Sequence, residues 1–164
     1  MNEYLKFIIL ELIRRGYDTL DKIIDELEDV DPKEVENMLK ELENQELIKK
    51  VKKGLIVKKE VYTLTYNGYE ELNRLRSKVE EKLRQASELV RLGRREEASE
   101  VLTPLVDFLP LLIMFGFIQD FMLLSFLSSM YGIALPEHDV EGEEMETEVE
   151  EVEDVDFDTD FDVF

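Results

Sequence analysis

The chain before residue 46 contains three stretches in which apolar residues recur every three or four positions, the spacing of an amphipathic helix. These stretches cover residues 2–15, 20–27 and about 32–45. The third has the clearest start signal, because Asp31 stands at the N-cap position and Pro32 in the first turn, where proline is well tolerated. The pattern therefore predicts three short helices that share one core.

A different pattern follows, in which β-favouring residues occupy positions 47–51 and 61–65. The connection between the two runs is basic and contains Gly54, where the chain can turn. These features predict an antiparallel hairpin. The next apolar stripe, at about residues 72–92, predicts a longer helix that ends at Gly93.

Residues at the end of the expected hairpin form the pattern Y-x-L-T-x-x-G-x-x-x-L, namely Tyr62, Leu64, Thr65, Gly68 and Leu72. Leu64 can point into a core, Thr65 can cap the next helix, and Gly68 permits a close approach to the strand behind it. This pattern, behind three short helices, resembles the winged-helix domains of PadR-like and MarR-like transcriptional regulators. The resemblance covers residues 1 to about 75. It implies that the hairpin is a wing and that the third helix is the recognition helix.

The third helix carries outward-facing donors that suit phosphates and base edges. These donors are Lys33, Asn37, Lys40 and Asn44. Glu36 and Glu41 lie on the same side of the helix and would repel the DNA backbone. The helix alone therefore leaves open whether it reads DNA.

The expected wing is more strongly basic than this helix. It places six ammonium groups within eleven residues: Lys49, Lys50, Lys52, Lys53, Lys58 and Lys59. Such a cluster suits DNA phosphates. The alternative is that these lysines only prevent unwanted pairing at exposed strand edges. The resemblance favours duplex DNA as the partner.

Residues 101–136 are unusually apolar, at 24 of 36 positions. A helix that is apolar all round must be buried all round, in a shared core or in lipid. A membrane span is disfavoured, since only 12 uncharged residues separate Asp107 from Asp120 and about 20 apolar residues are needed. We expect instead that two copies of the chain pack these helices into one core, as a homodimer through residues 72–135.

The same segment has a second interpretation, a ligand pocket lined by Met114, Phe115, Phe117, Phe121 and Met122. In either case Pro110 and Gly116 interrupt the segment, so a pair of shorter helices is expected rather than one rod.

The tail, residues 137–164, holds 15 of the 40 acidic residues and no basic one, so we expect it to be disordered. From residue 154 onward aspartates alternate with valine, phenylalanine and threonine, and Phe157, Phe161 and Phe164 are candidate partner-binding residues. The pattern resembles the acidic, phenylalanine-ended tails by which bacterial single-stranded DNA-binding proteins recruit partners. The tail is expected to recruit a basic protein, to lie on the wing lysines and compete with DNA, or only to add solubility.

Composition supports a division into a winged-helix domain (1–70), a helical oligomerisation region (71–136) and the tail. The net charge is −20, but the chain before the tail carries 25 acidic and 20 basic residues and is only mildly acidic. There is no cysteine, and Met1 precedes a charged amphipathic segment rather than an apolar leader. These features predict a cytoplasmic protein.

Catalytic motifs are not found in this sequence: it has no Gly-rich phosphate loop, no serine with a candidate base, and no metal-ligand spacing. The single histidine, His138, lies in the tail. We therefore expect no enzyme, no cofactor and no metal site.

The fold expected is mainly α with a small β-hairpin: an N-terminal winged helix-turn-helix, C-terminal helices and a disordered acidic tail. The function expected is a dimeric, DNA-binding transcriptional regulator. The alternative is a winged-helix scaffold for protein–protein interaction, in which the apolar helices and the tail dock partners.

Overall fold

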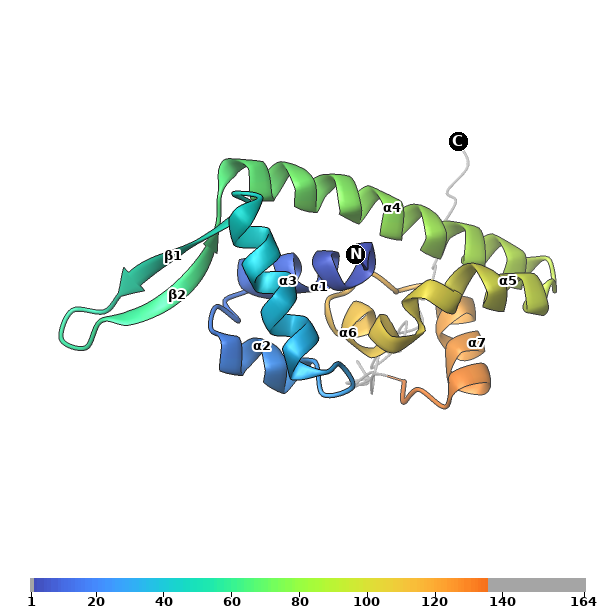
Figure 1. Ribbon diagram of the computed structural model, residues 1–164. Coiled ribbons are helices and arrows are strands. Elements are labelled where there is room, and N and C mark those ends of the chain that lie inside the picture. Colours follow the sequence, from blue (N-terminus) through green and yellow to red (C-terminus); the bar gives the residue numbers. More distant parts are fainter. Residues whose placement is uncertain (1, 136–164) are drawn as a thin grey trace, which may run out of the picture.

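The chain forms helices around one β-hairpin in a computed structural model that describes residues 2–135 (Figure 1). The elements are α1 (Glu3–Arg14), α2 (Leu20–Glu26), α3 (Pro32–Asn44), β1 (Ile48–Lys53), β2 (Lys59–Leu64), α4 (Tyr66–Arg91), α5 (Arg95–Leu102), the 3-10 turn η1 (Thr103–Phe108), α6 (Leu109–Met114) and α7 (Phe121–Tyr131). The mainly helical fold with a small antiparallel hairpin is thus confirmed. The predictions for the tail, including Phe157, Phe161 and Phe164, lie outside the described residues.

Local capping signals place the first three helices where the sequence predicted them. The hydroxyl of Thr19 accepts the backbone N–H of Lys22 at 3.3 Å and caps α2. The carboxylate of Asp31 accepts the N–H of Lys33 at 2.8 Å and caps α3. Gly16 follows α1 with a φ of 97°, a left-handed conformation that favours glycine.

Helix α1 lies at the centre of the fold, in contact with α2, α4, β2 and η1 (Figure 1). Every residue from Leu5 to Ile13 is buried, so this helix is covered on all sides and not on one face only. A single hydrophobic core runs from Leu5 in α1 to Leu127 in α7. One core therefore spans both sides of the boundary predicted at residue 70.

The apolar C-terminal segment is buried largely within its own chain. Gly116, with a φ of 81°, separates α6 from α7, which confirms two short helices in place of one rod. The buried side chains include Phe108, Leu112, Phe126 and Leu127. The need for burial that suggested a dimer is thus met mostly inside one chain, and the homodimer stays a prediction.

The five residues expected to line a ligand pocket do not share one. Phe115 is buried and Phe117 is half-buried, and their rings lie edge to face at 6.5 Å. The side chains of Met114, Phe121 and Met122 are exposed. Among the described residues, no helix combines the length and the apolarity that crossing a bilayer requires.

Candidate nucleic-acid interface

The base of the hairpin is fixed to the body of the protein. β1 pairs antiparallel with β2, and the cross-strand pair Ile48 and Leu64 is buried in the core. On the other edge of β2, the N–H of Tyr62 donates to the backbone carbonyl of Asp18 at 2.7 Å. Strand pairing on one edge and this bond on the other hold the orientation of the hairpin.

The junction between the hairpin and α4 uses the predicted threonine and glycine. The hydroxyl of Thr65 accepts the N–H of Gly68 at 3.0 Å and donates to the carbonyl of Glu46 at 2.6 Å, so one side chain caps α4 and binds the start of the hairpin. A Cβ atom on Gly68 would lie only 2.0 Å from the carbonyl oxygen of Leu47. The predicted close approach is confirmed, and only glycine fits it without a backbone shift.

The outer half of the hairpin projects away from the body (Figure 1), and every residue from Lys52 to Glu60 is exposed. At its tip lie three consecutive apolar side chains, Leu55, Ile56 and Val57, with exposed fractions of 102%, 97% and 69%. Sequence reasoning missed this tip. The signal was present, because an apolar triplet in the connection of a hairpin has no core to enter unless the hairpin folds back.

The six lysines of the hairpin do not form one flat patch. Cross-strand partners lie on the same face and successive residues alternate between faces. The register pairs Lys50 with Tyr62 and Lys52 with Glu60 on one face. It places Lys49, Lys53 and Lys59 on the other face, and Lys58 directly before β2. Positive charge therefore surrounds the hairpin.

Two of these lysines form ion pairs with acidic residues of the body. The ammonium of Lys50 lies 3.8 Å from Glu43, and that of Lys53 lies 3.7 Å from Asp18. Burial raises the pKa of Tyr62, whose ring lies 5.7 Å from the Lys50 ammonium. The other four make no ion pair with any residue from 2 to 135: Lys49, Lys52, Lys58 and Lys59. Their charges face solvent.

Helix α3 presents its predicted donors on an exposed face. These donors are Lys33, Asn37, Lys40 and Asn44. The two acids expected beside them, Glu36 and Glu41, are half-buried. A carboxylate oxygen of Glu41 also accepts the side-chain N–H of Gln45 at 3.3 Å, so Glu41 is partly engaged within the protein. The donors are thus more accessible than the acids.

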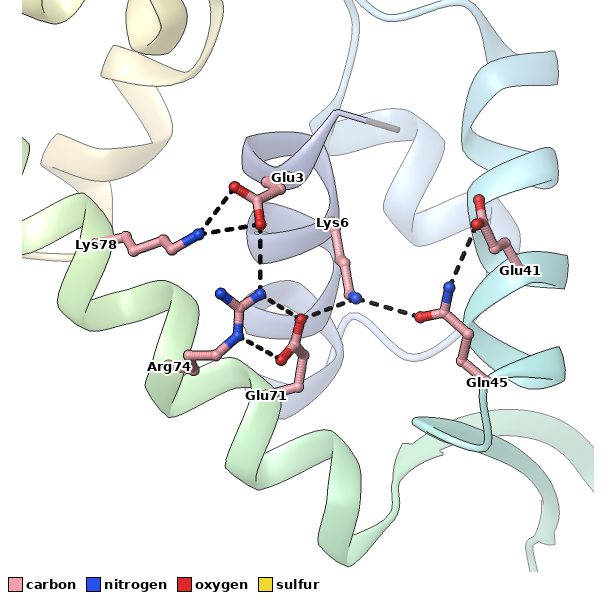
Figure 2. A network of polar contacts seen from close by, with 7 residues as sticks. All are labelled: Glu3, Lys6, Glu41, Gln45, Glu71, Arg74 and Lys78. Carbon is pink, nitrogen blue, oxygen red and sulfur yellow. Dashed lines mark hydrogen bonds and ion pairs between the residues drawn. The ribbon is translucent and has the colours of Figure 1, made fainter.

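A network of polar contacts holds α3 against α1 and α4 (Figure 2). The ammonium of Lys6 lies between Glu71, at 2.9 Å, and the side-chain oxygen of Gln45, at 3.2 Å. Arg74 continues the network, bonding Glu71 at 2.8 Å and Glu3 at 3.4 Å. The hydrogen bond from Arg74, followed by that from Lys6, lowers the pKa of Glu71 to about 2. The donor face of α3 is therefore fixed relative to α1 and α4.

The arrangement offers cationic and amide donors to an anionic surface. Within residues 2–135 no group of three or more His, Cys, Asp or Glu side chains lies close enough together to hold a metal ion. The absence of an enzyme activity, a cofactor and a metal stays a prediction. His138 lies outside the described residues.

Comparison with known proteins finds no match among protein-family models, curated proteins or solved structures. The winged-helix resemblance therefore rests on the residues from Tyr62 to Leu72 and on the element order of the first 75 residues.

Proposed function

We propose that the protein is a DNA-binding transcriptional regulator of the winged-helix type. The observation that carries the proposal is the projecting hairpin with four lysines unpaired among the described residues, next to the exposed donor row of α3. In this proposal the hairpin is the wing and binds phosphates, while α3 enters the major groove. The regulator acts as a cytoplasmic dimer through residues 72–135.

The distribution of acids limits how DNA binds. α2 and α3 carry several exposed or half-exposed carboxylates, among them Asp21, Asp25, Glu36 and Glu43. These repel phosphates, so the hairpin supplies most of the affinity and α3 mainly the base contacts. We therefore expect steep salt dependence from the hairpin and a smaller contribution from Lys33 and Lys40.

The test is a pair of double variants that lose the same charge. Changing Lys58 and Lys59 to Gln should weaken binding to duplex DNA at every sequence and reduce the slope of log K against log salt by at most about 1.8, since each phosphate contact contributes about 0.9. Changing Lys82 and Arg84 to Gln removes two charges from α4 and should leave the slope nearly unchanged. Equal effects of the two pairs would contradict a specific role of the hairpin.

The tail has a regulatory place in this proposal. Its 15 carboxylates recruit a basic partner or compete with DNA for the hairpin lysines, and Phe157, Phe161 and Phe164 contact the partner. Removing the tail should then raise DNA affinity if it competes, or abolish capture of a partner if it recruits.

A second function, a scaffold for protein–protein interaction, is favoured by one observation. Leu55, Ile56 and Val57 are exposed at the end of the hairpin, where an apolar pocket of a partner would cover them. Replacing all three with serine separates the two functions. Loss of a stoichiometric protein partner with DNA binding retained supports the scaffold; weakened DNA binding with no protein partner supports the regulator.

A further inference from the structure

An open cavity of about 570 Å³ lies on the side of the protein where α1 and α4 meet the connection between α6 and α7. Three arginines line it, Arg14 and Arg15 from the end of α1 and Arg76 from α4. None of them belongs to the hairpin or to α3. The cavity is therefore separate from the proposed DNA surface.

The three arginines are held together by one buried carboxylate. Glu11 is fully buried, and its two oxygens accept bonds from Arg14 at 2.5 and 3.1 Å, from Arg15 at 2.8 Å and from Arg76 at 3.0 Å. Burial raises the pKa of Glu11, but the hydrogen bonds from the three arginines outweigh it and leave the pKa lowered. Glu11 is therefore ionised and cancels one of the three positive charges.

Most N–H donors of these arginines have no acceptor among the described residues. Each guanidinium has five N–H donors. The three together use five of them on acceptors within residues 2–135, four on Glu11 and one on the carbonyl of Phe115 at 2.9 Å. One of the remaining donors, the Nε–H of Arg76, is shielded from solvent and has no acceptor among the described residues. Such a donor is costly to bury unless something binds it.

Aromatic rings fix two of the guanidinium groups in place. The guanidinium carbon of Arg15 lies 4.4 Å from the centre of the Phe115 ring, and that of Arg76 lies 5.8 Å from the Phe117 ring. A guanidinium placed over a ring has less freedom to reorient than one in open solvent. Planar, preorganised forks of this kind suit the two oxygens of a carboxylate or phosphate.

The carboxylates at the rim do not neutralise the cluster. Asp120 also lines the cavity, but it accepts bonds from Ser87, from Arg91 at 2.9 Å and from the backbone of Met122 at 3.0 Å. Glu80 makes no ion pair with any described residue and is exposed. Because Arg91 cancels the charge of Asp120, only Glu11 and Glu80 count against the three arginines, and one positive charge remains.

We propose that this cavity binds an oxyanion, the carboxylate or phosphate group of a small molecule, between Arg14, Arg15 and Arg76. The anion occupies the unused guanidinium edges and compensates the excess charge. Because Arg15 is the C-cap of α1 and also donates to the carbonyl of Phe115, an anion here tightens the link between the first helix and the C-terminal helices. The site is an effector site independent of the hairpin.

The test follows the arginine Nε–H signals of the full chain by NMR during titration with inorganic phosphate, and separately with acetate, at constant ionic strength. The signals of Arg14, Arg15 and Arg76 should shift saturably, whereas that of Arg94, paired with Glu97 on α5, should not. Arg76→Gln should weaken binding at least tenfold, and Arg94→Gln should change it less than twofold. If Arg76→Gln fails to fold by its thermal melt, Arg14→Gln takes its place.

A chain ending at Leu135 identifies the source of the anion. Tighter phosphate binding by the shortened chain means that carboxylates of residues 136–164 occupy the site in the full chain; equal binding means that a free small anion is the ligand. Failure of both chains to bind either anion, or unchanged affinity in the arginine variants, would overturn the proposal.

Discussion

The contact between Gly68 and Leu47 fixes the position of the hairpin on α4, and Gly68→Ala tests it. The added Cβ would lie 2.0 Å from the carbonyl oxygen of Leu47, 3.0 Å from its carbonyl carbon and 3.4 Å from the Cβ of Leu64. Ordinary contacts between carbon and oxygen are about 3.3–3.6 Å. The backbones must therefore separate by roughly 1.3–1.6 Å, because neither atom of Leu47 can rotate away.

Two effects of opposite sign compete in this variant. Alanine is favoured over glycine inside a helix by about 0.8–1 kcal/mol. Overpacking typically costs about 1–3 kcal/mol, and an overlap of this size with backbone lies at the upper end. We expect a net loss of about 2 kcal/mol, which lowers Tm by about 4–8 °C in a chain of this length.

The assay is thermal and urea unfolding followed by far-UV circular dichroism. Asn67→Ala is the matched control, since its neighbouring position on α4 is exposed and should change stability by less than about 0.5 kcal/mol. If Gly68→Ala is as stable as the parent, or more stable as helix propensity alone predicts, then the contact with Leu47 does not exclude a larger side chain at this position.

Three other predictions concern the ion pairs of Glu71, the cap at Thr65 and the exposed tip of the hairpin. The pKa of Glu71 in the folded protein is about 2, below its ordinary 4.5, so its ion pairs stabilise the fold above pH 4.5 and lose that effect as the pH falls from 4.5 to 2. Glu71→Gln should lower the free energy of unfolding at pH 7 by at most about 3 kcal/mol and by almost nothing at pH 2. Glu81→Gln is the control, and because its ion pair is exposed, its effect should depend less on pH. If the free energy of unfolding changes with pH in parallel for Glu71→Gln and the parent, the prediction is contradicted. Thr65→Ala should cost about 1–2 kcal/mol and Thr65→Ser much less in urea unfolding, because serine keeps the cap; equal losses would exclude the hydroxyl as the cause. Serine at residues 55–57 should leave Tm unchanged, and a lower Tm would show that the tip packs against the protein.

The parts of the fold that the sequence predicted are those set by local chemistry. Asp31 and Thr65 cap helices through bonds to backbone groups two or three residues away, so the sequence alone carries the signal. Gly116 separates α6 from α7 by adopting a positive φ, which also depends little on distant residues. Element order and the caps could therefore be derived before the structure.

The rest depends on contacts between distant segments. Lys6 and Glu11 are charged residues on a helix whose apolar spacing predicted one buried face, yet both are buried because α4 supplies Glu71 to one and Arg76 to the other. The faces on which the hairpin lysines lie follow from the strand register, which pairs Lys53 with Lys59. Neither relation can be obtained from residue spacing within one element.

The residues of the candidate site were proposed from the sequence, but their arrangement in space was not. All ten proposed DNA-contacting residues are on α3 or the hairpin, as expected, and the exposed tip at Leu55 was missed. The arginine cavity was missed as well, because Arg14 and Arg76 are 62 positions apart in the sequence. Their common partner Glu11 becomes apparent only when α1 and α4 are packed together.

The measurement that tests the proposed function most directly is fluorescence anisotropy with labelled random-sequence duplex DNA at low and moderate salt, comparing the full chain with a chain ending at Leu135. We predict that the shortened chain binds with clear salt dependence and that the full chain binds more weakly if the tail competes for the lysines. Changing Lys49, Lys52, Lys58 and Lys59 to Gln should remove most of the binding. If neither chain binds DNA at low salt, the regulator proposal is contradicted and the exposed apolar tip becomes the surface to pursue.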